Sequence, residues 1–310
     1  MDLSSINPVV LAAALMVAAT PILLAAIGEL IVEKAGVLNL GVEGMMIVGA
    51  VLGFIVAVQS GNPYLGMVGA AVGGAGLGLL FALLTQVLLA NQVASGLALT
   101  LFGLGFSALL GQGFVGISPP RTPKLNFGPL SEIPVLGPVL FSHDFMVYVS
   151  LAIVAAVWYF LRYTRAGMIL RAVGENHDAA HALGYRVRRI RVLAIMFGGA
   201  CAGMGGAYLS LIRVPQWTEG MTAGAGWIAL ALVVFASWRP WRVVLGAYLF
   251  GGIVVLQLNL QAAGFRIPVE YLSMSPYLIT ILVLVLISSG KARGSLNAPG
   301  SLNRSFHASG

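Results

Sequence analysis

The chain has 310 residues, of which 59% are hydrophobic and only 9% charged, and its mean hydropathy is +0.95. Water-soluble domains carry about a quarter charged residues, so this composition excludes a soluble globular fold. In lipid every backbone polar group needs an internal partner, which leaves helices or a closed barrel. The apolar runs here are long and continuous instead of short and alternating, so the sequence predicts an all-α integral membrane protein.

Nine apolar stretches are long enough to cross a bilayer, which takes roughly 17–25 residues each. They lie at 8–28, 40–58, 64–89, 93–115, 144–161, 191–212, 221–237, 243–262 and 271–289. We therefore expect about nine transmembrane helices, within a range of about eight to ten, in one membrane domain over 1–289.

Three polar segments interrupt or follow these spans. The segment 116–143 is rich in proline and the segment 162–190 is rich in arginine, and both are too long to be simple turns. Residues 290–310 form a Gly/Ser/Asn-rich tail without periodicity, which predicts disorder.

The distribution of Lys and Arg predicts the orientation, because basic residues near span ends collect on the cytoplasmic side. If 162–190 is cytoplasmic and the helices alternate, thirteen of the 17 basic residues lie on that side. The other side holds Arg121, Lys124, Arg213 and Arg266. This bias places the N-terminus outside and the C-terminus inside. It also explains the net charge of +7 without a nucleic-acid partner.

Forty glycines are many for a helical protein. In a bilayer, small residues let helix backbones approach closely, so two glycine-rich runs predict tight helix crossings, with a role in a solute path as the alternative. The runs contain Gly66, Gly69, Gly73, Gly74, Gly76 and Gly78, and Gly198, Gly199, Gly203, Gly205 and Gly206.

A short match indicates an internal repeat. Residues 43–45 and 219–221 both read Glu-Gly-Met, and each opens a predicted span. In the alternating topology the two copies are antiparallel, which gives an inverted repeat of spans one to four and six to nine. Transporters often use such repeats, with the solute path at the interface between them.

The segment 29–43, ELIVEKAGVLNLGVE, holds three carboxylates and Asn39 between two apolar spans. A short cytoplasmic loop would explain these charges. Alternatively the chain re-enters the membrane as a broken helix, which survives only when buried in protein or lining a cavity. Glu43 is then either a capping and packing acid at a helix N-terminus or a path-lining acid.

A second polar segment joins two apolar spans at Asn91-Gln92-Val93-Ala94-Ser95-Gly96. Asn and Ser are good N-caps, so a plain turn is one interpretation. If the segment is re-entrant, its amides suit a neutral polyhydroxyl or base-bearing solute, because amides donate and accept hydrogen bonds without a charge to desolvate.

The stretch 171–211, RAVGENHDAAHALGYRVRRIRVLAIMFGGACAGMGGAYLSL, predicts a short helix between two spans. The helix is expected to begin with the acids Glu175 and Asp178 and to continue with small residues. Gly184 is expected to end it. A short helix whose side chains are mostly small can fit into a groove of another protein. The alternative is an amphipathic helix resting on anionic lipid.

The sequence lacks the residues that ATP hydrolysis, metal binding and disulfide formation require. There is no GxxxxGK[ST] phosphate loop, so the chain should not hydrolyse ATP itself. The four histidines and the single Cys201 form no metal-ligand spacing, so we expect no metal, no cofactor and no disulfide. A non-enzymatic membrane protein is therefore expected.

The 171–211 stretch resembles the cytoplasmic coupling segment of bacterial ABC importer permeases of the branched-chain amino acid, ribose and nucleoside group. Residues 20–50 and 90–103 resemble the nucleoside and simple-sugar branch in particular. The resemblance covers about residues 10–289. It implies a permease in the bacterial plasma (inner) membrane, energised by a separate ABC ATPase and supplied by an extracytoplasmic solute-binding protein. It also implies a second permease subunit, more often a related one than an identical copy, and contact with membrane lipid.

The resemblance carries over residue by residue. The residues that fall on the coupling motif, and would seat in the ATPase, are Gly174, Glu175, Asn176, Asp178, Ala179, Ala180 and Gly184. Those that fall on motifs near the translocation path are Asn39, Gly41, Glu43, Gly44, Asn91, Gln92 and Ser95. The segment 116–143, with Arg213, Glu219, Arg266 and Glu270, is the expected docking face for the binding protein.

Two rival functions remain open at this point. An ion-coupled secondary transporter of a small polar solute would use Glu43 as its coupling carboxylate and need no ATPase. A scaffold without transport activity would show no solute dependence, and the polar breaks at Asn39 and Asn91 argue against it.

Overall fold

The computed structural model describes residues 8–262, the single positions 271, 274, 278, 281, 282 and 285, and residues 298–307. Within this part of the chain the structure is helical and contains no strand, which confirms the all-α fold class. The helices are α1 (Pro8–Lys34), α2 (Val42–Ser60), α3 (Pro63–Ala82), α4 (Gln92–Gly111), α5 (Leu136–Leu140), α6 (Phe145–Tyr163), α7 (Arg165–Glu175), α8 (His177–Ala182), α9 (Val187–Tyr208), α10 (Ala225–Phe235) and α11 (Pro240–Ala262). Five-residue π-helical segments, Leu83–Val87 and Leu209–Arg213, extend α3 and α9.

Seven helices in the described residues are long and apolar enough to cross a membrane. They are α1, α2, α3 and α9 with their π extensions, α4, α6 and α11, and they correspond to seven of the predicted spans. The chain is thus a multi-pass membrane protein. Most of the predicted span 271–289 lies outside the described residues.

The span predicted at 221–237 is wrong as a full crossing. Its helix, α10, has 11 residues, which cover about 16 Å of a hydrocarbon core about 30 Å thick. The preceding residues form turns, because Gly220, Ala223 and Gly224 all have positive φ. Glu219-Gly220-Met221 therefore lies in this turn region and does not open a helix.

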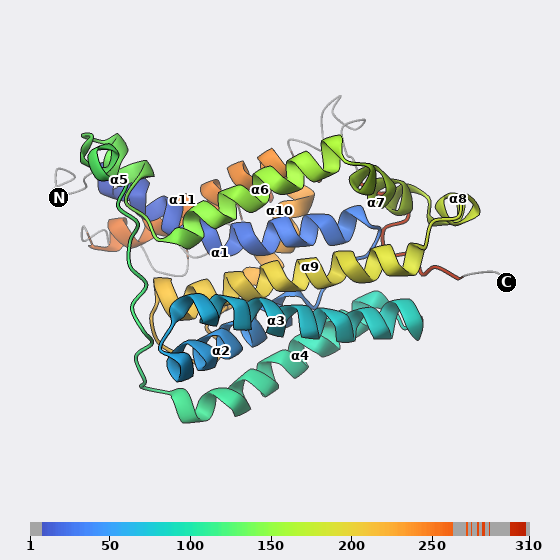
Figure 1. Ribbon diagram of the computed structural model, residues 1–310, viewed down its shortest axis with the longest axis horizontal. Coiled ribbons are helices and arrows are strands. Elements are labelled where there is room, and N and C mark those ends of the chain that lie inside the picture. Colours follow the sequence, from blue (N-terminus) through green and yellow to red (C-terminus); the bar gives the residue numbers. More distant parts are fainter. Residues whose placement is uncertain are drawn as a thin grey trace.

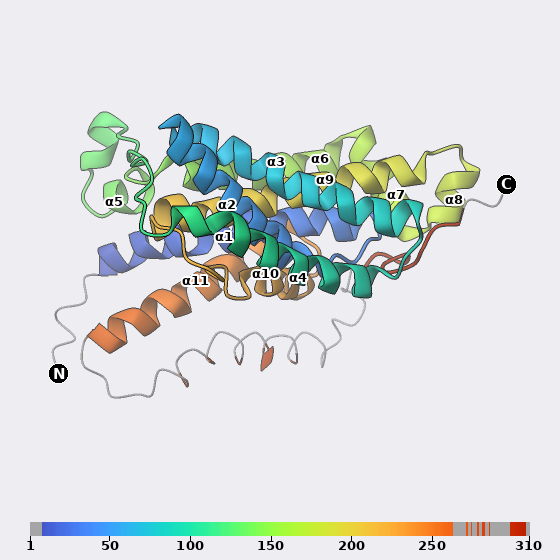
Figure 2. The same ribbon diagram turned by 90° about the horizontal axis from the view of Figure 1, so that it is seen from below.

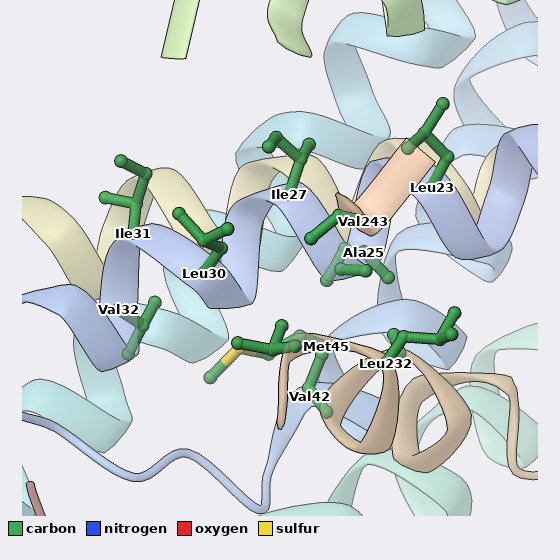
Figure 3. Close-up of a cluster of buried hydrophobic side chains, with 14 of the residues drawn as sticks. Leu23, Ala25, Ile27, Leu30, Ile31, Val32, Val42, Met45, Leu232 and Val243 are labelled. Carbon is green, nitrogen blue, oxygen red and sulfur yellow. The ribbon is translucent and has the colours of Figure 1, made fainter. Parts of the chain in front are cut away.

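Helix α1 is the centre of the bundle. Every residue from Ala18 to Glu33 is buried, as expected for a helix that is hydrophobic all round. Helices α2, α6, α9, α10 and α11 all pack against it. Figure 3 shows side chains of α1 meeting Val42 and Met45 of α2, Leu232 of α10 and Val243 of α11 in one hydrophobic cluster.

Helix α9 lies beside α1 and runs in the opposite direction (Figure 1). It also packs closely on α2 and α3 through glycines on both sides of the contact. A Cβ atom at Gly206 would lie 1.9 Å from the carbonyl oxygen of Met46, and one at Gly74 would lie 2.0 Å from that of Gly199. These glycines form the predicted tight crossings, which only a hydrogen side chain permits. Gly76 is an exception, since no atom lies within 4 Å of the position of its Cβ.

The proline-rich segment 116–143 and the arginine-rich helices lie at opposite ends of the bundle. Helix α5 marks the first end, and α7 and α8 mark the second (Figure 1). The second end, called the arginine-rich end below, comprises α7, α8, the start of α9 and residues 298–307.

Residues 298–307 are folded onto the arginine-rich end, where the sequence predicted disorder. Figure 2 shows this segment, in red, running beside α8. Ser301 and Phe306 are buried, with exposed fractions of 3% and 4%. The expectation of disorder is wrong for these ten residues, because contacts with α7, α8 and α9 order a sequence that has no periodicity of its own.

We predict that Gly206→Ala lowers the free energy of unfolding by about 1–3 kcal/mol, because the added methyl group overlaps Met46 across a rigid helix crossing. Thermal unfolding of the purified protein can be followed with a thiol-reactive dye, since the only cysteine, Cys201, is buried. Gly76→Ala is the matched control and should leave the unfolding temperature unchanged or slightly raised. Equal unfolding temperatures for the two variants would contradict the crossing.

Candidate functional site

Helices α7 and α8 form a bent pair at the arginine-rich end (Figure 1). Asn176 separates them and caps α8, because its Oδ1 accepts hydrogen bonds from the backbone N–H groups of Asp178 and Ala179 at 3.1 and 3.0 Å. Gly184 ends the turn after α8 with φ of +86°, which confirms the predicted stop. The sequence thus fixes both ends of α8 with local interactions.

The outer face of α8 is exposed and carries small side chains together with one acid, Asp178, and one histidine, His181. Asp178, Ala179 and Gly184 lie on it, and Leu183 projects beside them with 76% of its surface exposed. Sequence reasoning did not select Leu183. A single exposed apolar side chain is common on protein surfaces, so Leu183 does not by itself mark a contact surface.

Two of the predicted coupling residues face inward instead. Ala180 is buried against Val173, Val187 and Phe306. Gly174 is buried at the end of α1, where a Cβ atom would lie 2.0 Å from the carbonyl oxygen of Lys34. Their positions tie the α7–α8 pair to the bundle and leave the outer face to the other members of the motif.

Arg191 connects α8 to the rest of the protein. Its side chain is fully buried, with 0% exposed. Nε donates to the carbonyl oxygen of Ala35 at 3.1 Å, Nη1 to that of Arg304 at 2.9 Å and to Oε1 of Gln86 at 3.5 Å, and Nη2 contacts Nδ1 of His177 at 3.2 Å. One guanidinium group therefore joins the α1–α2 connection, α3, α8 and residues 298–307.

Among the described residues no carboxylate forms an ion pair with Arg191. A buried cation needs hydrogen-bond acceptors in place of water, and here they are two backbone carbonyls, an amide and an imidazole. The carbonyl of Ala35 lies just beyond the C-terminus of α1, where the helix dipole is negative and favours a positive charge.

The burial of Arg191 could have been predicted from its spacing on the helix, although the basic composition of the segment did not indicate it. Arg186, Arg188 and Arg189 are exposed, as a topological basic run predicts. Arg191, in contrast, shares a helical stripe with the buried residues Val187, Ala194, Ile195 and Gly198. Its spacing on α9, not its charge, marks it as an inward residue.

The α1–α2 connection, residues 35–41, is non-helical and lies deep in the protein. Asn39 is completely buried, and its Nδ2 donates to Oε2 of Glu29 at 3.2 Å. The backbone N–H of Leu38 donates to Oε1 of Gln92 on α4 at 2.9 Å. The structure thus has the predicted broken helix, and an exposed loop is wrong here because Glu29, Glu33 and Glu43 are all buried.

Helix α4 closes over this connection. The hydroxyl of Thr100 donates to the carbonyl oxygen of Leu40 at 3.1 Å, and a Cβ atom at Gly96 would lie 2.9 Å from the backbone nitrogen of Gly41. Gln92 and Ser95 are buried on the same helix, and Nε2 of Gln92 has no hydrogen-bond partner among the described residues. Asn91 is exposed and caps α4 by accepting from the N–H of Ala94 at 3.0 Å.

Glu43 caps a helix other than its own. Its Oε1 accepts from the hydroxyl of Thr222 at 2.6 Å and the N–H of Gly224 at 2.9 Å, and Oε2 accepts from the N–H of Gly226 at 2.7 Å. These donors surround the N-terminus of α10, where a carboxylate also offsets the positive end of the helix dipole. The geometry is that of the capping and packing acid, and the capped helix is α10 instead of α2.

The two groups of predicted residues are therefore separate in space but connected. The α8 group and the group around Asn39 and Gln92 lie on either side of Arg191, which bonds to His177 in one and to Ala35 next to the other. The structure describes a continuous polar contact from an exposed helix to an irregular segment within the membrane-spanning helices.

The family described as the permease component of the branched-chain amino acid transport system matches residues 11–286. The chain belongs to this family. It is a membrane-spanning, non-catalytic permease subunit of an ABC importer. Membership implies an ATPase partner and a solute-binding protein. It also removes the secondary-transporter and scaffold alternatives.

Three relatives cover nearly the whole permease. TsgC13 of Haloferax volcanii, provisionally named a glucose ABC transporter permease protein, is 42% identical over 94% of this chain and 95% of its own. The nucleoside ABC transporter permease protein NupC of Lactococcus lactis is 32% identical over 91% and 93%. The guanosine ABC transporter permease protein NupQ of Bacillus subtilis is 31% identical over 92% and 93%. No solved structure was found to match the permease.

Glu43→Gln should lower the free energy of unfolding by about 1–3 kcal/mol. Three donors now bind the carboxylate, and the amide nitrogen of glutamine cannot accept a hydrogen bond from any of them. The matched control is Glu219→Gln, since Glu219 is exposed in the turn before α10. The dye assay on Cys201 measures both. A Glu43→Gln protein as stable as the control would show that the cap is dispensable.

The contact between His177 and Arg191 should depend on pH. Burial, and then the charge of Arg191, lowers the pKa of His177 below its ordinary value of 6.5, while Asp178 opposes this and Arg304 and His307 reinforce it. Nδ1 can accept from Arg191 only when it carries no proton. Because the unfolded chain binds the proton more readily, the stability from this contact is present above about pH 6.5 and is lost as the pH falls.

Hydrogen exchange of the α8 amides measures this effect. After correction for the intrinsic rates, we expect protection of α8 to fall between about pH 7.5 and about pH 5.5 in the parent protein. His177→Gln keeps an acceptor without a titrating group and should abolish the dependence. His181→Gln, at an exposed position on the same helix, should retain it.

Proposed function

We propose that this permease takes up a nucleoside or a simple sugar across the bacterial plasma membrane, with the N-terminus outside and the arginine-rich end in the cytoplasm. ATP binding in the partner would draw the coupling helices together and open the path outward, and hydrolysis would reset it. The thirteen basic residues expected on one side support this orientation.

The observation that carries the proposal is the contact chain from α8 to the α1–α2 connection. Asp178, Ala179 and Gly184, with Glu175 and Asn176, present an exposed surface that the ATPase can grip. Gly174 and Ala180 anchor that surface to the bundle. Movement of α8 acts on His177, hence on Arg191, and hence on Ala35, the first residue of the irregular segment.

Neutral polar groups support the solute class. Asn39, Gln92 and Ser95 are buried where α1, α2 and α4 meet, and Nε2 of Gln92 has no partner among the described residues. Amides and hydroxyls suit a neutral solute with several hydroxyl groups or a base. The relatives are named for glucose, nucleosides and guanosine, which agrees with this chemistry. We assign Asn39, Gln92 and Ser95 to the path, with Glu43 and Asn91 as residues that hold its walls.

The partners follow from the two ends of the bundle. An ABC ATPase would bind α8, and a second, related permease would complete the path. The segment 116–143, which lies at the opposite end (Figure 1), would receive the solute-binding protein. Arg213, at the end of the π-helical extension of α9, and Glu219, in the turn region after it, would contribute to the same docking face. Arg266 and Glu270, also expected at this face, lie outside the described residues. The antiparallel pair α1 and α9, each followed by an irregular segment, supports an inverted repeat.

Ala179→Arg should abolish binding of the ATPase and ATP-dependent uptake, because a long cation would replace a small side chain on the gripped surface. Ala166→Arg is the matched control, since Ala166 is equally an exposed alanine but lies on α7, away from α8. Co-purification of the ATPase and uptake into proteoliposomes containing both permeases, ATPase and binding protein measure the result. Normal coupling in Ala179→Arg would refute the assignment of α8.

The same proteoliposomes test the solute. Labelled guanosine and labelled glucose are the probes, and we expect ATP-dependent accumulation of one of them, with competition from unlabelled compounds of the same class. Accumulation of neither would overturn the solute class while leaving the coupling result intact.

A further inference from the structure

A cavity of about 690 Å³ opens at the arginine-rich end. The last turns of α1 and α6, the helix α7, the start of α11 and residues 298–299 surround it. It is separate from the buried polar group around Asn39 and Gln92. Of its lining residues, the proposed transport cycle uses only Glu175, on the surface assigned to the ATPase.

Basic side chains dominate the walls of this cavity. Lys34, Arg162, Arg171 and Arg239 line it, opposed by the single carboxylate Glu175. Lys34 comes from α1, Arg171 and Glu175 from α7, and Arg239 from the residue before α11, so distant parts of the chain bring these charges to one cavity. The 23-residue helix α11 also begins here, and its N-terminus adds a positive dipole end. An anion is the ligand that this electrostatic environment favours.

Two tryptophans give the cavity rigid walls. Trp158 and Trp238 line it. Trp238 is buried, and its indole N–H donates to Oε2 of Glu33, which fixes the ring. Four side chains thus supply charge while two flat rings limit the shape, an arrangement typical of a small-molecule pocket with a few convergent polar groups.

The surroundings place the cavity at the edge of the bilayer. Trp158 packs against Trp241 and Tyr163, with ring centroids 6.0 and 5.4 Å apart. Trp241, Tyr163 and Tyr159 are 52%, 61% and 59% exposed. Tryptophan and tyrosine gather where membrane-spanning helices meet the headgroups, so the cavity opens at headgroup level.

We propose that this cavity binds a phosphate group, presented by the headgroup of an anionic phospholipid such as phosphatidylglycerol. Arg171 and Arg239 hold the phosphate as planar, multidentate donors, and Lys34 and Arg162 add charge. Glu175 accepts a hydrogen bond from a headgroup hydroxyl, which a glycerol headgroup offers. Basic pockets between membrane-spanning helices are a known means of binding such headgroups.

The site is next to the coupling surface. Arg171 and Glu175 belong to α7, and Glu175 directly precedes the cap residue of α8. A bound headgroup would therefore hold α7 against the ends of α1 and α11. This inference concerns a lipid site and does not depend on the identity of the transported solute or on the orientation of the protein.

Native mass spectrometry of the purified, delipidated full-length permease tests the proposal. The probes are dioleoyl-phosphatidylglycerol and zwitterionic dioleoyl-phosphatidylcholine. We expect preferential binding of phosphatidylglycerol, weakened about tenfold or more in the double variant Arg171→Gln/Arg239→Gln. The matched control is Arg188→Gln/Arg189→Gln, which removes the same charge from exposed positions of α9 that do not line the cavity, and it should bind as the parent does.

A competition arm separates the two sources of phosphate. If inorganic phosphate at millimolar concentration displaces phosphatidylglycerol from the parent, the cavity is a site for soluble phosphate and the assignment to lipid is overturned. Displacement only by phosphatidylglycerol itself assigns the site to lipid. Equal binding of the two lipids, or equal loss in both double variants, overturns the proposal. Should Arg171→Gln/Arg239→Gln fail to fold, Arg162→Gln at the exposed end of α6 is the alternative variant. It should also weaken the binding of phosphatidylglycerol, by a smaller factor.

Discussion

The buried guanidinium of Arg191 is the interaction on which the arginine-rich end depends. It is surrounded by neutral acceptors from four separate parts of the chain. If any one of these parts moved alone, the buried cation would lose one of its hydrogen-bond acceptors, which costs free energy. The four parts are therefore expected to move together. Under the proposed coupling role, a push on the six-residue helix α8 would therefore be passed to the α1–α2 connection.

The glycine crossings supply the complementary property, rigidity along the bundle. Helix α9 approaches α1, α2 and α3 so closely that backbone atoms are in contact, and close-packed helices of this kind shift as units instead of deforming. The irregular segments 35–41 and 214–224 are two of the places where the helical hydrogen bonding is interrupted. A permease built this way has rigid rods joined at a small number of irregular segments, which suits alternation between two states.

The sequence predicted the fold where local composition decides the outcome. Seven spans follow directly from continuous apolar runs, and the C-terminal end of α8 follows from Gly184, whereas Glu175, expected among the acids that open the helix, ends α7. Prediction failed where distant residues decide. The helix at 221–237 was predicted too long because Ala223 and Gly224 have positive φ in a turn whose backbone bonds to Glu43, 181 residues away along the chain from Gly224. Likewise Arg191, Ser301 and Phe306 gain their roles only through long-range contacts.

The order in which the chain is made gives residues 298–307 a further consequence. Ser301 accepts from the N–H of His177 and donates to the carbonyl of Glu175, so the α7–α8 pair is complete only after that part of the chain has been synthesised. A permease still emerging from the ribosome would present an unfinished platform. If α8 binds the ATPase as proposed, that binding surface would form only after translation has passed this segment.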